Sequence, residues 1–292
     1  MNLKEVKHRI LSVKNTQKIT SAMKLVSSAK LRRAQSAVEN LRPYRSNLDA
    51  MLRTVISATK DSRSHTLDTY TAIREEKRVV LIAVSSDTGL CGAFNANVVR
   101  LMNNVVQEYK ANGTDVTLFA VGSKMCDAAK KLGLQPDARL LSQAVTVDYN
   151  TVAQVAAEIL EQYHNGNIDK VEMVYTRFES MSRHTPVRKT FLPYVMDGET
   201  GEVRTPCDDI ILEPGREQLL ASMLPKSITF ELYSSLLDSA VSEHAARMLA
   251  MQLATDNADE LISTLTLEYN KARQQAITSE ILDIVGGSEA NR

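Results

Sequence analysis

Residues 226–285 read KSITFELYSSLLDSAVSEHAARMLAMQLATDNADELISTLTLEYNKARQQAITSEILDIV, a run of 60 residues without a glycine or a proline. At a rise of 1.5 Å per residue, a continuous helix of this length would extend about 90 Å. Helices of ordinary globular domains are much shorter, so the run favours a coiled coil. Chain breakers are scarce elsewhere too, since the 292 residues include only 11 Gly and 7 Pro. The fold is therefore expected to be built around long helices.

The same run carries a heptad repeat. Stepping by four and three residues from Leu237 gives a seam in which ten of twelve positions are apolar or aromatic, as at the a and d positions of a coiled coil. The seam favours Ala and Met over Leu, so a partner helix can approach closely while each layer buries less area. Its positions are Leu237, Val241, His244, Met248, Met251, Thr255, Ala258, Ile262, Leu265, Tyr269, Ala272 and Ala276.

The N-terminal segment, residues 1–42, also lacks Gly and Pro. Its heptad spacing begins with the apolar residues Leu3, Val6, Ile10 and Val13. The next four positions of the same spacing are polar, namely Gln17, Thr20, Lys24 and Ser27. A seam that turns polar must either shift its register or face something other than a plain apolar partner. Pro43 is expected to interrupt this helix.

The two ends of the chain carry opposite charge. Lys plus Arg and Asp plus Glu number 35 each, which removes any whole-protein argument for a nucleic-acid partner. Residues 1–45 hold 11 basic and 2 acidic side chains, whereas residues 226–292 hold 5 basic and 10 acidic ones. Opposite charge assists two helices in packing against each other. The alternative for the basic segment is a nucleic-acid-binding or membrane-surface helix.

Between the two ends, strands alternate with helices. The apolar run RVVLIAV at 78–84 suits a strand buried on both faces, and DVTLFAVG at 115–122 reads as a second strand. Helical patterns are predicted at 97–110, 123–131 and 151–164. Two alternating segments on either side of MSRHTP predict a hairpin. This order indicates an α/β layer with a mainly parallel, Rossmann-like sheet.

The turn Asp87-Thr88-Gly89-Leu90-Cys91-Gly92 follows the first strand and precedes a helix, where α/β folds often bind phosphates. Its GxxG spacing is no dinucleotide motif, the Lys-Ser/Thr of a P-loop is missing, and Asp87 would oppose a phosphate. Asp87, Gly89 and Gly92 are therefore interpreted as a structural turn in which glycine supplies a positive φ. Cys91 is a candidate nucleophile near a helix N-terminus, but a buried small residue is the favoured interpretation.

Other kinds of site find no support in the sequence. The three cysteines and five histidines show no metal-ligand spacing, so no zinc site is predicted. No stretch approaches the 18 or so consecutive apolar residues that a membrane-spanning helix needs.

Three blocks of the sequence resemble the gamma subunit of rotary ATP synthases, the central shaft of the catalytic head. They are RILSVKNTQKITSAMKLVSSAKLRRA at 9–34, SSDTGLCGAFN at 85–95 and EHAARMLAMQLATDNADELISTLTLEYNKARQQAITSEILDIVGG at 243–287. Their order and the total length also match that family. The resemblance implies a long antiparallel two-helix coiled coil of the N- and C-terminal arms with an inserted α/β body. It further implies no catalytic residue, no cofactor and no metal in this chain.

The resemblance also implies a function and partners. We expect a non-catalytic rotor subunit of a proton-translocating ATP synthase, which couples ion flow to the conformational cycling of the catalytic subunits and regulates ATPase activity. The expected partners are the alpha and beta subunits, three of each, the epsilon subunit and the membrane c-ring. The expected location is the cytoplasmic face of a bacterial inner membrane, as a peripheral protein with no direct membrane insertion and no nucleic-acid partner.

Residue by residue, the resemblance implies contacts between rotor and stator. Met23 and Lys24 would approach an acidic loop of the catalytic subunit. Polar contacts with the lever and bearing of the ring would come from Arg247, Arg273, Gln274 and Thr278. The planar fork of Arg273 suits carboxylates in a way that a mobile Lys would not reproduce. The α/β body would form the foot on the membrane ring and the epsilon subunit, with residues 202–209 as the candidate contact.

We expect an N-terminal coiled-coil arm at 1–60, an α/β body at 75–196, an irregular connection at 197–215 and a C-terminal coiled-coil arm at 216–292. Two other functions remain open at this point. One is a coiled-coil scaffold or nucleic-acid adaptor that uses the basic N-terminal arm, for which steeply salt-dependent DNA binding would be diagnostic. The other is a nucleotide-dependent enzyme built on the α/β middle, which would bind ATP or NAD tightly.

Overall fold

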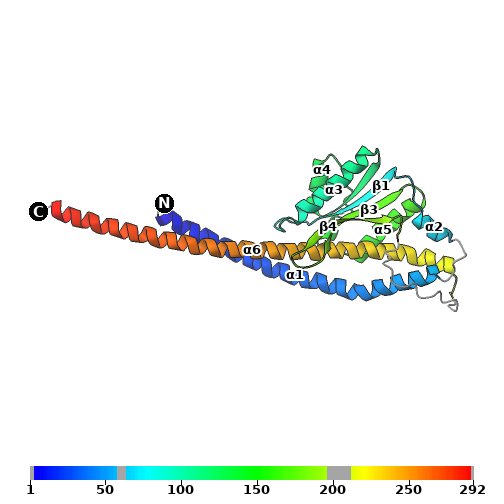
Figure 1. Ribbon diagram of the computed structural model, residues 1–292, viewed down its shortest axis with the longest axis horizontal. Helices are drawn as coiled ribbons and strands as arrows, with labels where there is room; N and C mark the ends of the chain where they lie inside the picture. Colours follow the sequence, from blue (N-terminus) through cyan, green and yellow to red (C-terminus); the bar gives the residue numbers. More distant parts are fainter. Residues whose placement is uncertain (1–2, 58–63, 196–211, 291–292) are drawn as a thin grey trace. The chain divides into compact units, whose positions relative to one another are not determined.

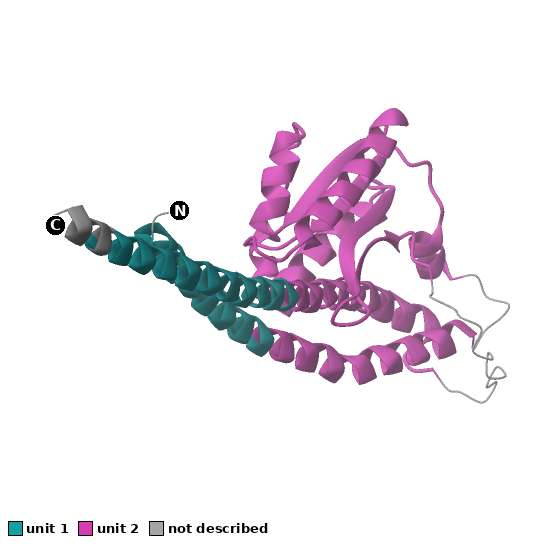
Figure 2. Cartoon of the chain, turned by 60° about the vertical axis from the view of Figure 1, so that its left-hand side comes forward, with its two compact units in different colours: residues 1–29, 247–292 teal, residues 30–246 magenta. Residues whose placement is uncertain are grey.

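The computed structural model describes residues 3–57, 64–195 and 212–290. The chain divides into two compact units, one of residues 1–29 with 247–292 and the other of residues 30–246 (Figure 2). Helix α1 (Leu3–Ser57) and helix α6 (Arg216–Ala290) each contribute to both units. The expected contact at 202–209 and most of the expected connection at 197–215 lie outside the described residues.

The two long helices are longer than the Gly and Pro positions predicted. Helix α1 runs without a break through Pro43, so the expected interruption there is wrong. Proline removes one helical hydrogen bond, but Pro43 lies on the exposed side of α1. Leu31, before Pro43 in the sequence, and Leu52, after it, are buried, so packing holds the helix on both sides of the proline. Helix α6 has 75 residues, about 110 Å at 1.5 Å each, and likewise contains Pro225.

The larger unit contains the predicted sheet. The sheet has four strands in the order β2 (Asp115–Val121), β1 (Arg78–Val84), β3 (Lys170–Phe178) and β4 (His184–Leu192). Strand β1 pairs in parallel with β2 and β3, and β3 forms the predicted antiparallel hairpin with β4. The predicted helices are α3 (Phe94–Ala111), α4 (Ser123–Lys131) and α5 (Tyr149–His164). Sequence patterns did not reveal the short helices α2 (His65–Thr71) and η1 (Leu141–Ala144), because neither is long enough to show a repeating helical pattern of apolar residues.

Both faces of the sheet are covered, which is why β1 is apolar along its length (Figure 1). Val79 and Leu81 of β1 belong to a core formed with α3 and α4. Val80 and Ile82 belong to a second core on the opposite face, formed with α5, the end of α1 and the first part of α6. Leu52 of α1 and residues from Leu220 to Leu236 of α6 are members of that second core. The long helices are thereby anchored in the α/β body.

One buried charge interrupts the apolar pattern of β3. Glu172 is 2 % exposed and accepts hydrogen bonds from Arg188 Nε at 2.7 Å and Lys170 Nζ at 2.9 Å. Burial by itself raises the pKa of the Glu172 carboxyl, but the hydrogen bonds from Arg188 and Lys170 outweigh it and hold that pKa below its ordinary value. The ionised Glu172 therefore joins β3 to the edge strand β4 through a buried ion pair.

Candidate functional site

The first feature of interest is the coil in the unit of residues 1–29 and 247–292. From Leu3 to Thr20, only the seam positions of α1 are buried or half-buried, and every other side chain is exposed. On α6, the same holds from Asp256 to Ala272 for the predicted seam positions Ala258, Ile262, Leu265, Tyr269 and Ala272. The heptad prediction is confirmed over these ranges. It is wrong at Ala276, which is exposed.

The first two polar positions of the α1 seam, Gln17 and Thr20, keep its register and meet polar partners. Gln17 Nε2 donates a hydrogen bond to Asp259 Oδ1 at 2.8 Å. Thr20 Oγ1 and Thr255 Oγ1 share another at 2.8 Å. At Gln17 and Thr20, the structure therefore has the alternative without a register shift. Because increasing residue numbers on α1 pair with decreasing ones on α6, the coil is antiparallel, as predicted.

This register explains where the paired part of the coil ends. Continued one heptad beyond the Gln17–Asp259 pair, this register brings Ile10 level with Leu265, and a second heptad brings Leu3 level with Ala272. Leu3 is the first residue of α1. Helix α6 therefore has no partner from α1 at Ala276, which accounts for the exposure of that residue.

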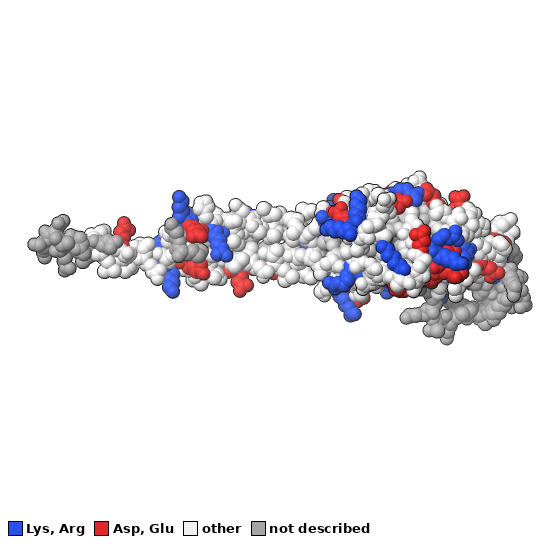
Figure 3. Space-filling model, turned by 90° about the horizontal axis from the view of Figure 1, so that it is seen from above, with Lys and Arg blue, Asp and Glu red and all other residues white. Residues whose placement is uncertain are grey.

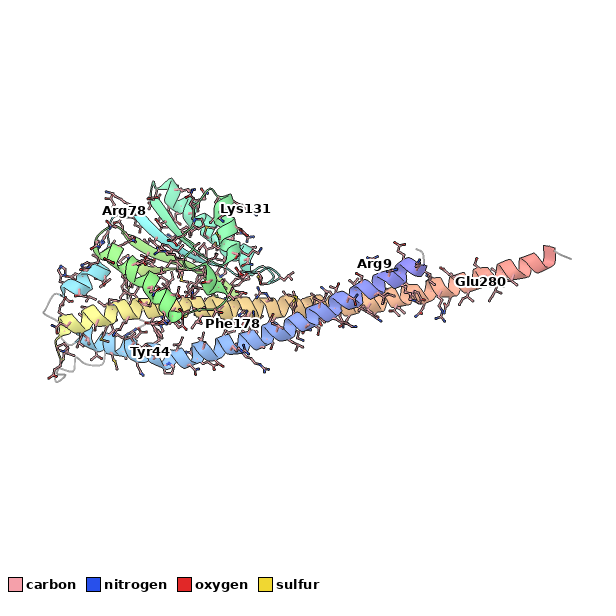
Figure 4. All side chains as sticks on the ribbon, turned by 180° about the vertical axis from the view of Figure 1, so that it is seen from behind. Arg9, Tyr44, Arg78, Lys131, Phe178 and Glu280 are labelled. Atoms are coloured by element: carbon pink, nitrogen blue, oxygen red, sulfur yellow. The ribbon has the colours of Figure 1, made fainter. Side chains whose placement is uncertain are left out.

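Three of the predicted contact residues lie on this unpaired end of α6. Arg273, Gln274 and Thr278 are all exposed, and Thr278 Oγ1 donates only to Gln274 O, at 2.9 Å within the same helix. Figure 4 shows Glu280 on the part of α6 that continues beyond the N-terminal end of α1, past Arg9. The side chains that the structure describes at this end, residues 273–282 and 284, are therefore available to a partner.

The other predicted contact residues lie at a different level of the coil. Met23 and Lys24 of α1 are half-buried. Arg247 on α6 is only 8 % exposed, so a partner could reach little of its side chain. Arg247 and Arg273 are 26 residues apart on one helix, roughly 40 Å at 1.5 Å per residue. The predicted residues thus form two separate groups along the coil and not a single site.

The turn after β1 is held together by its own side chains. Asn95 Oδ1 accepts from Ser86 N at 3.0 Å, and Asn95 Nδ2 donates to Ser86 Oγ at 2.7 Å. Gly92 has the expected positive φ of 60°. Gly89 does not, and the other left-handed residue of the turn is Leu90, at φ 64°. The expectation of a positive φ at Gly89 is therefore wrong, because the turn reverses one residue later.

The carboxylate of Asp87 lies at the N-terminus of α4. Its Oδ1 accepts from Ser123 N at 3.3 Å and also from Ser123 Oγ. A carboxylate at a helix N-terminus takes the place that a phosphate would need. Gly122 precedes this helix with φ 87°, and a Cβ there would lie 2.5 Å from Ser85 O. The Asp87 carboxylate and the backbone of residues 85 and 122 thus occupy the edge of the sheet where a nucleotide phosphate would bind, which argues against a nucleotide site.

Cys91 is 2 % exposed and packs with Phe94 and with Ala246 of α6. Its Sγ accepts a hydrogen bond from Asn95 Nδ2 at 3.2 Å. A thiol so covered suits packing better than nucleophilic attack. Within the larger unit, the turn of residues 85–95 is therefore fastened to α6 through Cys91 and Phe94.

The ranges that the structure describes contain no group of three or more His, Cys, Asp or Glu arranged to hold a metal ion. None of their helices is long and apolar enough to span a bilayer. Seen from above, Lys and Arg alternate with Asp and Glu over the α3 and α4 side of the larger unit, without a patch of one sign (Figure 3). That face offers no basic surface for a nucleic acid.

Comparison with known proteins gives concordant findings. The family model described as ATP synthase matches residues 2–290. The chain is 46 % identical to the ATP synthase gamma chain of Bacteroides thetaiotaomicron, over 98 % of this chain and 99 % of the relative. It is 44 % identical to the ATP synthase gamma chain of Phocaeicola vulgatus, over 99 % of each chain.

Solved structures share the fold. A chain of the Euglena gracilis mitochondrial ATP synthase, in a structure of OSCP, F1 and c-ring, matches with a TM-score of 0.63 and 20 % identity over 99 % of this chain and 94 % of that one. A chain from the central stalk and c-ring of the Tetrahymena thermophila mitochondrial ATP synthase matches with a TM-score of 0.57 and 23 % identity, over 81 % and 99 %. At these identities the likeness supports the fold alone.

Proposed function

The chain belongs to the ATP synthase gamma chain family, and on that premise we propose that it is the central rotor subunit of a proton-translocating ATP synthase. In this role it couples ion flow through a membrane sector to conformational cycling of catalytic subunits, in ATP synthesis or hydrolysis, and regulates ATPase activity. The chain itself carries out no chemical step. Family membership gives no support to the alternative of a nucleic-acid adaptor.

One observation carries the proposal. A long antiparallel coil ends in a stretch of α6 whose described side chains, at 273–282 and 284, are all exposed. Large apolar side chains are exposed there and along the coil, including Leu25 at 67 %, Leu253 at 56 % and Ile281 at 55 %. Apolar surface of this extent marks a protein-binding region. A coil with such a surface fits the centre of a ring of partner subunits.

The physical requirements of a rotor agree with this coil. A shaft shifts the conformational equilibrium of a surrounding subunit only by contacting its states differently. A coil of two unlike helices has no rotational symmetry, so it presents a different face to each of three identical neighbours. The α1 side is basic and the α6 side is acidic, which adds an electrostatic difference to the steric one. Turning the coil would then carry each catalytic subunit through binding, reaction and release.

We assign the contacts in two groups. Lys24, with Met23 beside it, meets an acidic loop of the catalytic subunits. Arg273, Gln274 and Thr278 meet the bearing at the far end. Their exposure supports this role, since a partner can reach all three side chains. Arg247 belongs to the first group, and its burial limits it to an edge contact.

The arms at 1–60 and 216–292 form the shaft in this proposal, and the α/β body at 75–196 forms the foot. The foot rests on the membrane c-ring and the epsilon subunit, while three alpha and three beta subunits surround the shaft. The similarity to gamma chains of bacterial ATP synthases supports a peripheral position at the cytoplasmic face of the inner membrane.

Purification of the native complex through a tag on a catalytic subunit tests the proposal. We expect one copy of this chain per three catalytic subunits, measured by quantitative mass spectrometry. One copy per catalytic subunit, or none, would contradict a central shaft.

Crosslinking tests the contact assignment. Lys24→Cys is compared with Lys131→Cys, an exposed lysine at the end of α4 in the proposed foot. Cys91 and Cys126 are buried and add little background, and Cys207 is replaced by Ser in both variants. An oxidative crosslink to a catalytic subunit carrying a cysteine in its acidic loop is expected from position 24 alone. Equal yields from both positions would refute the assignment.

A further inference from the structure

From Arg273 onward, the described side chains of α6 pack against no other described part of the chain. Every side chain that the structure describes from Arg273 to Ile284 is exposed, whereas Ala272, one residue earlier, is half-buried in the coil. Thr278 Oγ1 donates a hydrogen bond to Gln274 O, which belongs to the same helix, so this bond does not tie the stretch to another element. We call Arg273–Ala290 the tip, which spans roughly five turns.

The sequence of the tip is poorly suited to an isolated helix. The tip continues a helix that is already formed, so it bears no nucleation cost, but most helical stability in proteins comes from tertiary packing, and the described side chains of the tip have none. Ile277, Thr278 and Ile281 are β-branched, which lowers helix propensity. Gly286 and Gly287 follow in the final turns, and glycine disfavours an interior helical position more than any residue except proline.

Exposed apolar side chains add to the argument. Ile277 and Ile281 are 46 % and 55 % exposed and lie on one face of the helix, one turn apart. Leu282, at 65 %, lies on a different face, because a single residue step turns a helix by about 100°. A helical tip in water shields neither face. Burial of both faces requires a partner that encloses the tip and does not merely line one side.

We propose that the tip is a conditional helix, which opens locally in the isolated chain and is held in helical form by an enclosing protein partner. The partner half of this inference rests on the proposed function, whereas the opening of the free tip does not. Local opening is independent of the coil, because the paired seam ends at Ala272. The tip would then order only when the shaft is inserted, so that assembly and helix formation occur together.

Hydrogen exchange measured by mass spectrometry tests both halves, on the full-length chain alone and on the chain assembled with its catalytic-head subunits. In the free chain, amides of residues 274–290 should exchange on the order of 100-fold faster than those of residues 251–265. In the assembly, exchange of the tip should slow by at least about tenfold. A tip as protected as the coil in the free chain would overturn the inference, and so would a tip that stays unprotected in the assembly. Failure of the proposed function would be distinct, because the chain would then not assemble with the head subunits at all.

A substitution with opposite effects in the two states sharpens the test. Ile277→Ala with Ile281→Ala replaces β-branched residues by the best helix former, so exchange of the free tip should slow by about fourfold. In the assembly the same variant loses apolar contacts, so exchange of the tip should speed up. Leu261→Ala, at an exposed position on the paired part of the coil, is the control and should leave the tip unchanged in both states. An effect of the double variant with the same sign in both states would refute the conditional helix.

Discussion

Removing the buried charge of Glu172 tests whether the ion network under the sheet edge stabilises the α/β body. The change Glu172→Gln keeps the shape of the side chain and removes its charge. Glu172 has a side-chain exposure of 2 % and lies 2.7 Å from Arg188 Nε and 2.9 Å from Lys170 Nζ. Each cation has a second acidic partner, Glu108 for Arg188 and Glu76 for Lys170. Neither cation is therefore left wholly uncompensated.

These contacts set the expected magnitude. Breaking a buried ion pair by removing one partner costs about 3–5 kcal/mol. Because both cations keep a second carboxylate, we expect Glu172→Gln to cost less, about 2–3 kcal/mol. For a domain of roughly 200 residues this lowers the Tm by about 4–12 °C. The control is Glu108→Gln, which removes a carboxylate 2.7 Å from the same Arg188 but at a side-chain exposure of 54 %, and should cost under about 1 kcal/mol.

Urea and thermal unfolding followed by circular dichroism provide the measurement, repeated across pH. Because the folded-state pKa of Glu172 is lowered, its stabilising contribution is present above the unfolded pKa of about 4.3 and is lost as the pH falls through the folded value. The stability difference between wild type and Glu172→Gln should therefore shrink below about pH 4. Equal losses in Glu172→Gln and Glu108→Gln, or a difference that does not depend on pH in this range, would refute the reasoning.

Three further predictions concern the shaft and the turn. Arg273→Ala combined with Gln274→Ala should reduce ATP-driven proton pumping by roughly tenfold while the complex still assembles, and unchanged pumping would contradict the assigned contact. Lys24→Glu should impair pumping while shifting the Tm by less than about 2 °C, and a loss of stability large enough to explain the impairment would count against a role at the interface. Gly122→Ala should destabilise the body by more than about 2 kcal/mol in urea unfolding, because its Cβ would lie 2.5 Å from Ser85 O at φ 87°; a cost under 0.5 kcal/mol would mean that the backbone yields there.

The sequence predicted the α/β body closely because its signals are local. The apolar run 78–84 and the strand β1 have the same bounds, and the helix predicted at 123–131 is α4. Features that depend on distant residues were missed. Glu172 is a charged residue within an apolar strand, and the local sequence does not explain its burial. Its charge is tolerated because Lys170 of the same strand and Arg188 of the opposite strand pair with it. Pro43 was misjudged for a similar reason, because burial on both sides of it is not visible in the local sequence.

At the polar positions of the α1 seam, periodicity predicts which residues face a partner but not what that partner is. The heptad spacing predicted which α1 positions face a partner, including Gln17 and Thr20, yet their polarity left the nature of that partner open. The partners are Thr255 and Asp259, which lie 235 or more residues away in the chain and supply matching hydrogen-bonding groups. A polar pair in a seam stabilises less than an apolar one, but it disfavours arrangements that leave its members unpaired. The two arms therefore recognise each other through a pattern of apolar and polar layers, which neither arm displays on its own.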